Sequence, residues 1–114
     1  MKSLAIDQGT TSTRALLVDE QGQCTTLRTV THRQFYPRSG WVEHDPEELL
    51  HNIQTCLDAA ESTSGIGAVG IANQGESCLA WDSQTGKAIY PVIVWQDDRT
   101  RDEITELAKR GAEA

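Results

Sequence analysis

The chain has 114 residues, of which 38% are hydrophobic and 24% charged, and its formal net charge at pH 7 is −7. This length is enough for one folded domain with its own hydrophobic core. The acidic balance, without clusters of Lys and Arg, excludes nucleic acid and anionic membrane surfaces as partners, so any phosphate group must be bound locally.

The first third of the chain predicts three strands, over residues 3–7, 13–19 and 24–32. Residues 19–22, Asp-Glu-Gln-Gly, join the second and third strands and are typical of a hairpin turn. Residues 33–43 contain Pro and Gly without hydrophobic periodicity, which predicts a loop.

A helix is predicted to begin sharply after this loop. Asp45 is a favourable N-cap, Pro46 suits the first helical position, and Glu48 completes a pair that resembles a capping box. Apolar side chains then recur with the spacing of one buried helix face: Leu49, Leu50, Ile53, Cys56, Leu57 and Ala60. Residues 62–65 are expected to end the helix.

Residues 66–73 are small and apolar, which predicts a central strand that is buried on both faces. Residues 78–82 and 89–95 predict two more strands around a turn at 82–87, with Trp81 in the core.

The last predicted helix is capped by Thr100 together with Glu103 and packs through Ile104, Leu107 and Ala108. Three strands, a helix, a strand, a further hairpin and a helix indicate an α/β domain with a mixed sheet.

The turn between the first two predicted strands is rich in groups that bind phosphate. Gly9 permits close approach of the backbone to a ligand or a positive φ, and the next four residues, Thr10, Thr11, Ser12 and Thr13, supply hydroxyl and amide donors. Asp7 can hold a cation directly or through water, as magnesium prefers. The same composition is also typical of an ordinary β-hairpin turn, so both interpretations stay open on these residues alone.

Other patterns are better explained by structure than by function. Residues 65–70 match GxGxxG, but these glycines lead into a strand, which argues against a dinucleotide site. The histidines His32, His44 and His51 lack ligand spacing, and the cysteines Cys24, Cys56 and Cys78 indicate neither a disulfide framework nor a zinc site. Asp97 and Asp98 are expected in a solvated loop with a role in capping the last helix, and ordering of the acceptor cleft is the alternative. Trp41 is expected either to line the mouth of a cleft or to anchor its loop.

No apolar run reaches the length of a membrane span, and the N-terminus leads directly into a strand instead of a signal peptide. The sequence therefore predicts a cytoplasmic protein.

Four segments together resemble a known family. Residues 7–14 (DQGTTSTR), 40–46 (GWVEHDP), 70–74 (GIANQ) and 85–100 (TGKAIYPVIVWQDDRT) are similar to the N-terminal part of the FGGY carbohydrate kinases, and most similar to the glycerol kinases. The matches follow the family order and span nearly the whole chain. The resemblance implies an actin-like, ribonuclease H-like ATPase fold, of which residues 1–114 would form the first part of the N-terminal domain.

The activity that this resemblance implies is ATP-dependent phosphoryl transfer to a hydroxyl group of glycerol or of a related polyol or sugar. Residues 9–14 would bind the ATP phosphates, with Asp7 and Arg14 as catalytic residues and Asp7 also placing Mg²⁺. In this family the adenosine pocket and the catalytic base lie in the second half of the protein. The chain is therefore expected to be a fragment without its C-terminal domain and to be inactive alone. For the full-length protein, a homo-oligomer stays an open alternative.

The acceptor side of the resemblance contains one departure. In glycerol kinases the segment ending in Asn-Gln continues with Arg-Glu, and those two side chains bind the polyol hydroxyls. Here Gly75 stands in place of the arginine, Glu76 is retained, and Trp95 matches the aromatic residue that packs on the carbon edge of the acceptor. Loss of a charged donor typically weakens binding about tenfold to a hundredfold, which favours an acceptor other than glycerol, such as a longer or branched polyol.

Two alternatives to a kinase remain. An actin-like domain can act as a nucleotide-dependent sensor or assembly module, and Gly75 is also compatible with a degenerate kinase that binds sugar without catalysis.

Overall fold

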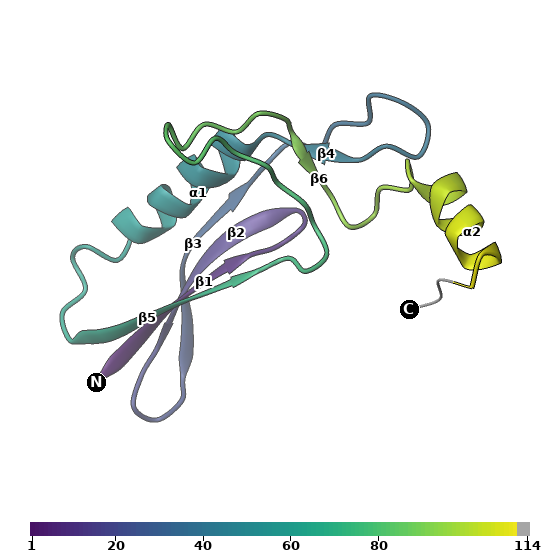
Figure 1. The fold of residues 1–114 in the computed structure, drawn as a ribbon. Helices are drawn as coiled ribbons and strands as arrows, with labels where there is room; N and C mark the ends of the chain where they lie inside the picture. Colours follow the sequence, from purple (N-terminus) through teal and green to yellow (C-terminus); the bar gives the residue numbers. More distant parts are fainter. Residues whose placement is uncertain (112–114) are drawn as a thin grey trace.

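The computed structural model describes residues 1–111, which form an elongated molecule of 55 × 29 × 29 Å (Figure 1). A four-stranded sheet and helix α1 (Pro46–Asp58) make the main body. A small ribbon of strands β4 (Glu43–His44) and β6 (Val92–Ile93) lies beyond it, and helix α2 (Arg101–Lys109) stands apart at the far end.

The sheet is mixed, as the sequence predicts. Its order is β3-β2-β1-β5, with bounds β1 Lys2–Gln8, β2 Ser12–Val18, β3 Cys24–Thr31 and β5 Ile66–Asn73. Strands β1, β2 and β3 form an antiparallel meander, whereas β5 runs parallel to β1 after the crossover through α1. The turn between β2 and β3 is the predicted one: the Asp19 carboxylate accepts from the backbone N–H groups of Gln21 and Gln23, and Gly22 takes a positive φ of 79°.

The core lies between the sheet and α1. Its buried side chains come from β1, β2 and α1, with further apolar residues packed around them: Leu4, Ile6, Ala15, Cys56 and Ala60, flanked by Leu27, Val30, Ile53, Leu57 and Ile66. Alternate residues of β1 face the helix, as the period of a half-covered strand requires.

Helix α1 begins as predicted but differs in two details. Asp45 caps it by accepting from the Glu47 N–H at 2.9 Å, and Pro46 occupies the first turn. The Glu48 carboxylate, however, accepts from the backbone and the guanidinium of Arg33 instead of completing a capping box. The buried face of the helix also differs from the predicted one. Leu50 is exposed, while Asn52 is buried and donates to the Thr31 carbonyl oxygen.

The prediction that residues 66–73 form a central strand buried on both faces is wrong. Strand β5 is an edge strand whose described partner is β1, and its side chains from Gly67 onward are exposed, Val69 and Ile71 included. A parallel strand of small apolar residues is normally covered on both faces. Among residues 1–111 nothing supplies that cover on the outer side of β5.

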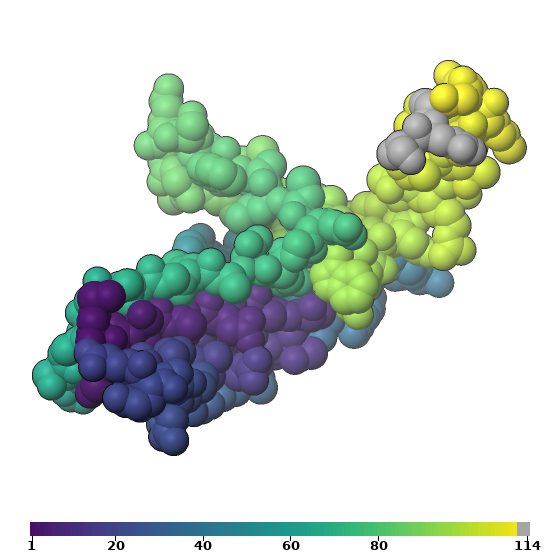
Figure 2. Space-filling model, turned by 90° about the horizontal axis from the view of Figure 1, so that it is seen from below, coloured from purple at the N-terminus to yellow at the C-terminus, as the bar shows by residue number. Residues whose placement is uncertain are grey.

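The predicted hairpin over residues 78–95 forms only in part. The turn at 82–87 is present, closed by Asp82, but Trp81 and Ala88 make an isolated bridge and Trp81 is 61% exposed instead of lying in the core. The regular pairing of this segment is between β6 and β4. Figure 2 shows the part of the segment around the turn (green) as an arm that projects from the body, separate from α2 (yellow).

Helix α2 forms where predicted, but its expected cap and packing are wrong. Within residues 1–111 the Thr100 side chain makes no capping hydrogen bond, and no residue of α2 is buried. Ile104 and Leu107 are exposed because the helix stands away from the sheet (Figure 2). Within residues 1–111, neither helix is long and apolar enough to cross a membrane.

Candidate functional site

The predicted phosphate turn connects β1 to β2. It is tight, because the Gly9 N–H donates to the Ser12 carbonyl oxygen at 2.9 Å. A Cβ atom at Gly9 would lie 3.3 Å from that same oxygen, so the missing side chain lets the turn close on itself. Gly9 does not take the positive φ that was one of its two predicted roles, and close approach to a ligand stays a prediction.

Asp7 and Arg14 face each other across the same hairpin. They are register partners on β1 and β2, and the Asp7 Oδ2 atom accepts from Arg14 Nη2 at 2.5 Å and from Arg14 Nε at 3.2 Å. Both side chains remain partly open to solvent. A cation or a phosphate arriving here would meet a carboxylate and a guanidinium that are already paired.

The turn forms one wall of a polar pocket of about 400 Å³. Because β1 and β5 are parallel and pair up to Gln8 and Asn73, their carboxyl ends open at the same edge of the sheet. The pocket is lined by the end of β1, the end of β5 and one aromatic side chain: Asp7, Gln8, Gly9, Thr10, Asn73, Gln74, Gly75, Glu76 and Trp95. The structure thus brings together six of the predicted site residues, Asp7, Gly9, Thr10, Gly75, Glu76 and Trp95.

The other predicted residues do not line this pocket. Thr13 is completely buried, and its carbonyl oxygen accepts from Cys56 on α1, so it lies on the core side of the sheet. Thr11 is exposed beside the turn, and Ser12 helps to close it. Arg14 reaches the pocket only through its ion pair with Asp7.

Trp95 contributes a third side of the pocket lining. Its indole N–H donates to the Thr10 hydroxyl at 3.0 Å, and its backbone N–H donates to the Ser77 hydroxyl at 3.2 Å. Gly75 leaves open space, because a Cβ atom there would meet nothing within 4 Å. Glu76 has a backbone φ of 62°, which residues other than glycine rarely adopt.

Two histidines lie beneath this pocket, and the sequence pattern did not indicate them. His32 Nε2 lies 2.8 Å from the Thr10 carbonyl oxygen, and His44 Nδ1 lies 3.3 Å from the Gln74 amide nitrogen. Burial and the neighbouring His32 lower the pKa of His44 to about 4, against a smaller opposing effect of Glu48.

The segment that carries Trp95 is held by a buried ion cluster. Arg99 donates to Asp97 at 2.7 and 2.9 Å and to Glu43 at 2.9 Å, and it stacks on the Trp41 ring at 3.8 Å. The Asp97 side chain is only 2% exposed, so the predicted solvated loop is wrong at this position. Hydrogen bonding to Arg99 lowers the pKa of Asp97 to about 2. Of the two roles predicted for Trp41, the structure favours the anchor.

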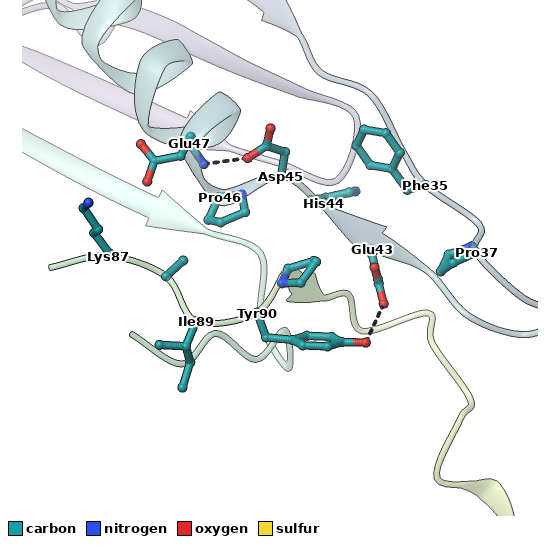
Figure 3. Close-up of a pocket in the computed structure, with 12 residues that line it drawn as sticks. Phe35, Pro37, Glu43, His44, Asp45, Pro46, Glu47, Lys87, Ile89 and Tyr90 are labelled. Carbon is teal, nitrogen blue, oxygen red and sulfur yellow. Dashed lines mark hydrogen bonds between the residues drawn. The ribbon is translucent and has the colours of Figure 1, made fainter. Parts of the chain in front are cut away.

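A second, larger cavity of about 780 Å³ was not predicted. It lies between β4, the start of α1 and residues 87–91 (Figure 3). Phe35, Ile89 and Tyr90 give it a largely apolar lining, and the Tyr90 hydroxyl donates to the Glu43 carboxylate at 3.3 Å.

No group of three or more His, Cys, Asp or Glu side chains that could hold a metal occurs within residues 1–111. Asp7 is one of two carboxylates that line the polar pocket, the other being Glu76. That arrangement fits Mg²⁺, which typically takes one or two carboxylates and completes its shell with water and substrate phosphates.

Comparison with known proteins assigns the chain to a family and finds similar sequences. The sequence pattern of the FGGY family of carbohydrate kinases, N-terminal domain, matches residues 3–114. A glycerol kinase of Saccharopolyspora erythraea is 50% identical over 114 residues, which cover 96% of this chain and 23% of that protein. The chain therefore spans about a quarter of the length of the relatives that it matches.

Solved structures of carbohydrate kinases are similar to the chain as well. The chain superposes on Plasmodium falciparum glycerol kinase with ADP at a TM-score of 0.83 and 33% identity, covering 96% of this chain and 23% of that one. A gluconate kinase from Lactobacillus acidophilus gives a TM-score of 0.87 at 22% identity over 97% of this chain and 23% of that one, a likeness of fold alone.

Proposed function

The chain belongs to the FGGY family of carbohydrate kinases, and we propose that it forms the N-terminal part of an enzyme that transfers the γ-phosphoryl group of ATP to a hydroxyl group of a polyol or sugar. The observation that carries this proposal is the polar pocket itself. Gly9 and Thr10, from the turn that is rich in phosphate donors, line one cavity together with the acceptor-side carboxylate of Glu76, so both substrates would meet there.

In the proposed reaction the acceptor hydroxyl oxygen forms a bond to the γ-phosphorus, and the bond from that phosphorus to the β,γ-bridging oxygen breaks. ADP leaves, and the hydroxyl proton would pass to a general base of the full-length enzyme. Positioning and charge neutralisation dominate such reactions.

The residues of the chain would share these tasks. Backbone and hydroxyl groups of residues 9–12 would bind ATP phosphates, and Arg14 would move from Asp7 toward the phosphate charge. Asp7 would hold Mg²⁺, directly or through water, and the metal would neutralise phosphate charge. Trp95 would pack on the carbon edge of the acceptor, while Glu76 would accept its hydroxyl hydrogen bonds.

The acceptor is proposed to be larger than glycerol. Gly75 contributes no donor, and the space next to it is open. An acceptor with an additional carbon or branch would occupy that space and recover contact area that glycerol leaves unused.

The experiment that tests the function is ADP release by the full-length gene product containing this chain. It would be measured with Mg²⁺ and ATP against glycerol and a panel of longer polyols, pentoses and hexoses. Turnover that prefers a larger acceptor supports the proposal in full, and turnover with glycerol alone rejects the proposed acceptor class. Absence of turnover with every acceptor, while ATP still binds, favours a sensor or a degenerate kinase.

A further inference from the structure

The two histidines beneath the polar pocket each contact one of its walls. His32 follows β3 and reaches the carbonyl oxygen of Thr10, which lies in the phosphate turn. His44, in β4, reaches the side-chain amide of Gln74, which follows β5. The two rings are 4.4 Å apart between centroids, with planes at 70°, so they form one unit that spans from one wall to the other.

The partners assign the protons of both rings. A carbonyl oxygen only accepts, so His32 donates to Thr10 through a protonated Nε2. The Gln74 nitrogen only donates, so His44 accepts through an unprotonated Nδ1. His44 is completely buried, and its lowered pKa keeps it neutral at physiological pH, which is the form that can accept.

His44 is also fully enclosed by its neighbours. His44 packs on the wall of the larger cavity next to Phe35 and Asp45 (Figure 3), and Asp45 is fixed as the cap of α1. Within residues 1–111, His32 Nδ1, His44 Nε2 and Gln74 Oε1 are buried without a hydrogen-bond partner. Buried polar atoms without partners are costly, so ordinary core packing gives no reason for two imidazoles at these positions.

We propose that His32 and His44 are a positioning pair that sets the separation of the two pocket walls, with His32 holding the Thr10 backbone and His44 holding the Gln74 side chain. Neither ring lines the polar pocket, so neither is a catalytic residue. The kinetic part of this inference rests on the proposed function, in which the Thr10 wall binds ATP and the Gln74 wall binds the acceptor.

The two positions allow a matched test, because Asn and Gln mimic different edges of imidazole. The Asn carboxamide reaches the place of Nδ1, and the Gln carboxamide reaches the place of Nε2. His44→Asn therefore keeps the contact with Gln74, whereas His44→Gln loses it. At His32 the order is reversed, so that His32→Gln keeps the contact with Thr10 and His32→Asn loses it.

In the full-length protein, we expect His32→Asn to raise KM for ATP and His44→Gln to raise KM for the acceptor, each about tenfold for one buried hydrogen bond. His32→Gln and His44→Asn should stay near wild type. If Asn and Gln behave alike at both positions, the pair only fills space and the proposal is overturned. His32 is less buried than His44, so its variants keep the test valid if substitutions at His44 prevent folding.

Hydrogen exchange provides a readout that does not need activity. In the ligand-free full-length protein, His32→Asn should speed exchange in residues 8–12, and His44→Gln in residues 73–77, relative to their matched partners. This pattern in a protein that phosphorylates no acceptor would support the positioning pair and reject the proposed function. Normal turnover with equal exchange in both members of each pair would reject the positioning pair alone.

Discussion

The indole N–H of Trp95 donates to the hydroxyl of Thr10 at 3.0 Å, which joins two residues 85 positions apart. This bond joins two parts of the polar pocket's lining, the phosphate turn and the segment that follows β6. It also means that the Thr10 hydroxyl oxygen already accepts one hydrogen bond before any phosphate arrives.

Trp95→Phe keeps an aromatic ring and removes the donor. We expect about a two- to tenfold fall in kcat/KM of the full-length enzyme, because a neutral, partly exposed hydrogen bond contributes about 0.5–1.5 kcal/mol. Thr10→Val should cost at least as much, because it also removes a hydroxyl proposed to donate to ATP phosphates, and the double variant should cost little more than Thr10→Val alone. Thr10→Ser, which keeps the hydroxyl, is the control. Fully additive losses would show that the two side chains act independently.

Gly75→Arg tests whether the missing side chain sets acceptor choice. Open space at its Cβ position and the absence of a positive φ mean that the substitution should leave folding intact. We expect the ratio of kcat/KM for glycerol to that for the best larger acceptor to rise about tenfold, because a charged donor to a hydroxyl contributes about 1.5–3 kcal/mol. Gly75→Ala, which adds no donor, is the matched control. An equal change for all acceptors would place the determinant elsewhere.

Glu76 combines an unfavourable backbone conformation with a carboxylate in the pocket. At a φ of 62°, Glu76→Gly should relieve about 1 kcal/mol of strain, so the melting temperature should not fall. Without the carboxylate, KM for the acceptor should rise about tenfold or more. Glu76→Gln keeps one acceptor oxygen and should lie between. An unchanged KM would mean that the acceptor binds at another site.

The sequence predicted those parts of the fold that depend on local chemistry. Strands β1 to β3, the turn at Asp19 and the start of α1 at Asp45 follow from hydrophobic period, turn residues and capping. The pocket could also be anticipated in part, since the parallel pairing of β1 and β5 follows from the crossover through α1.

The failures have a common physical origin. Burial of β5, Trp81 and α2 was inferred from apolar residues whose covering partners do not occur within residues 1–111. The contacts of His32 with Thr10 and of Arg99 with Glu43 join positions 22 and 56 residues apart, and no local spacing encodes them. Two adjacent aspartates, Asp97 and Asp98, therefore predicted a solvent-exposed loop. In the structure the Asp97 carboxylate is buried in an ion pair with Arg99.

Asp97 should stabilise the fold at neutral pH and lose that effect in acid. Its pKa is lowered from 3.8 to about 2 in the folded state, so the stabilisation is complete above pH 4 and disappears as the pH falls through about 2. The difference amounts to about 2 kcal/mol. Urea midpoints of wild type and Asp97→Asn in the full-length protein should differ at pH 6 and converge toward pH 2. A constant difference would show that the carboxylate charge is not the cause.

His44 should produce a separate loss of stability on acidification, which begins at a higher pH than the loss caused by Asp97. Its pKa falls from 6.5 to about 4 on folding. Between these two values the imidazole is protonated in the unfolded state but neutral in the folded state, so acidification favours unfolding. The free energy of unfolding should therefore be greatest above pH 6.5 and decrease by about 2 kcal/mol between pH 6.5 and pH 5. His44→Asn keeps the contact with Gln74 but does not titrate, so its urea midpoint should change less over this range. If the two proteins lose stability in parallel, another group is responsible, since a neutral amide cannot reproduce the titration of an imidazole.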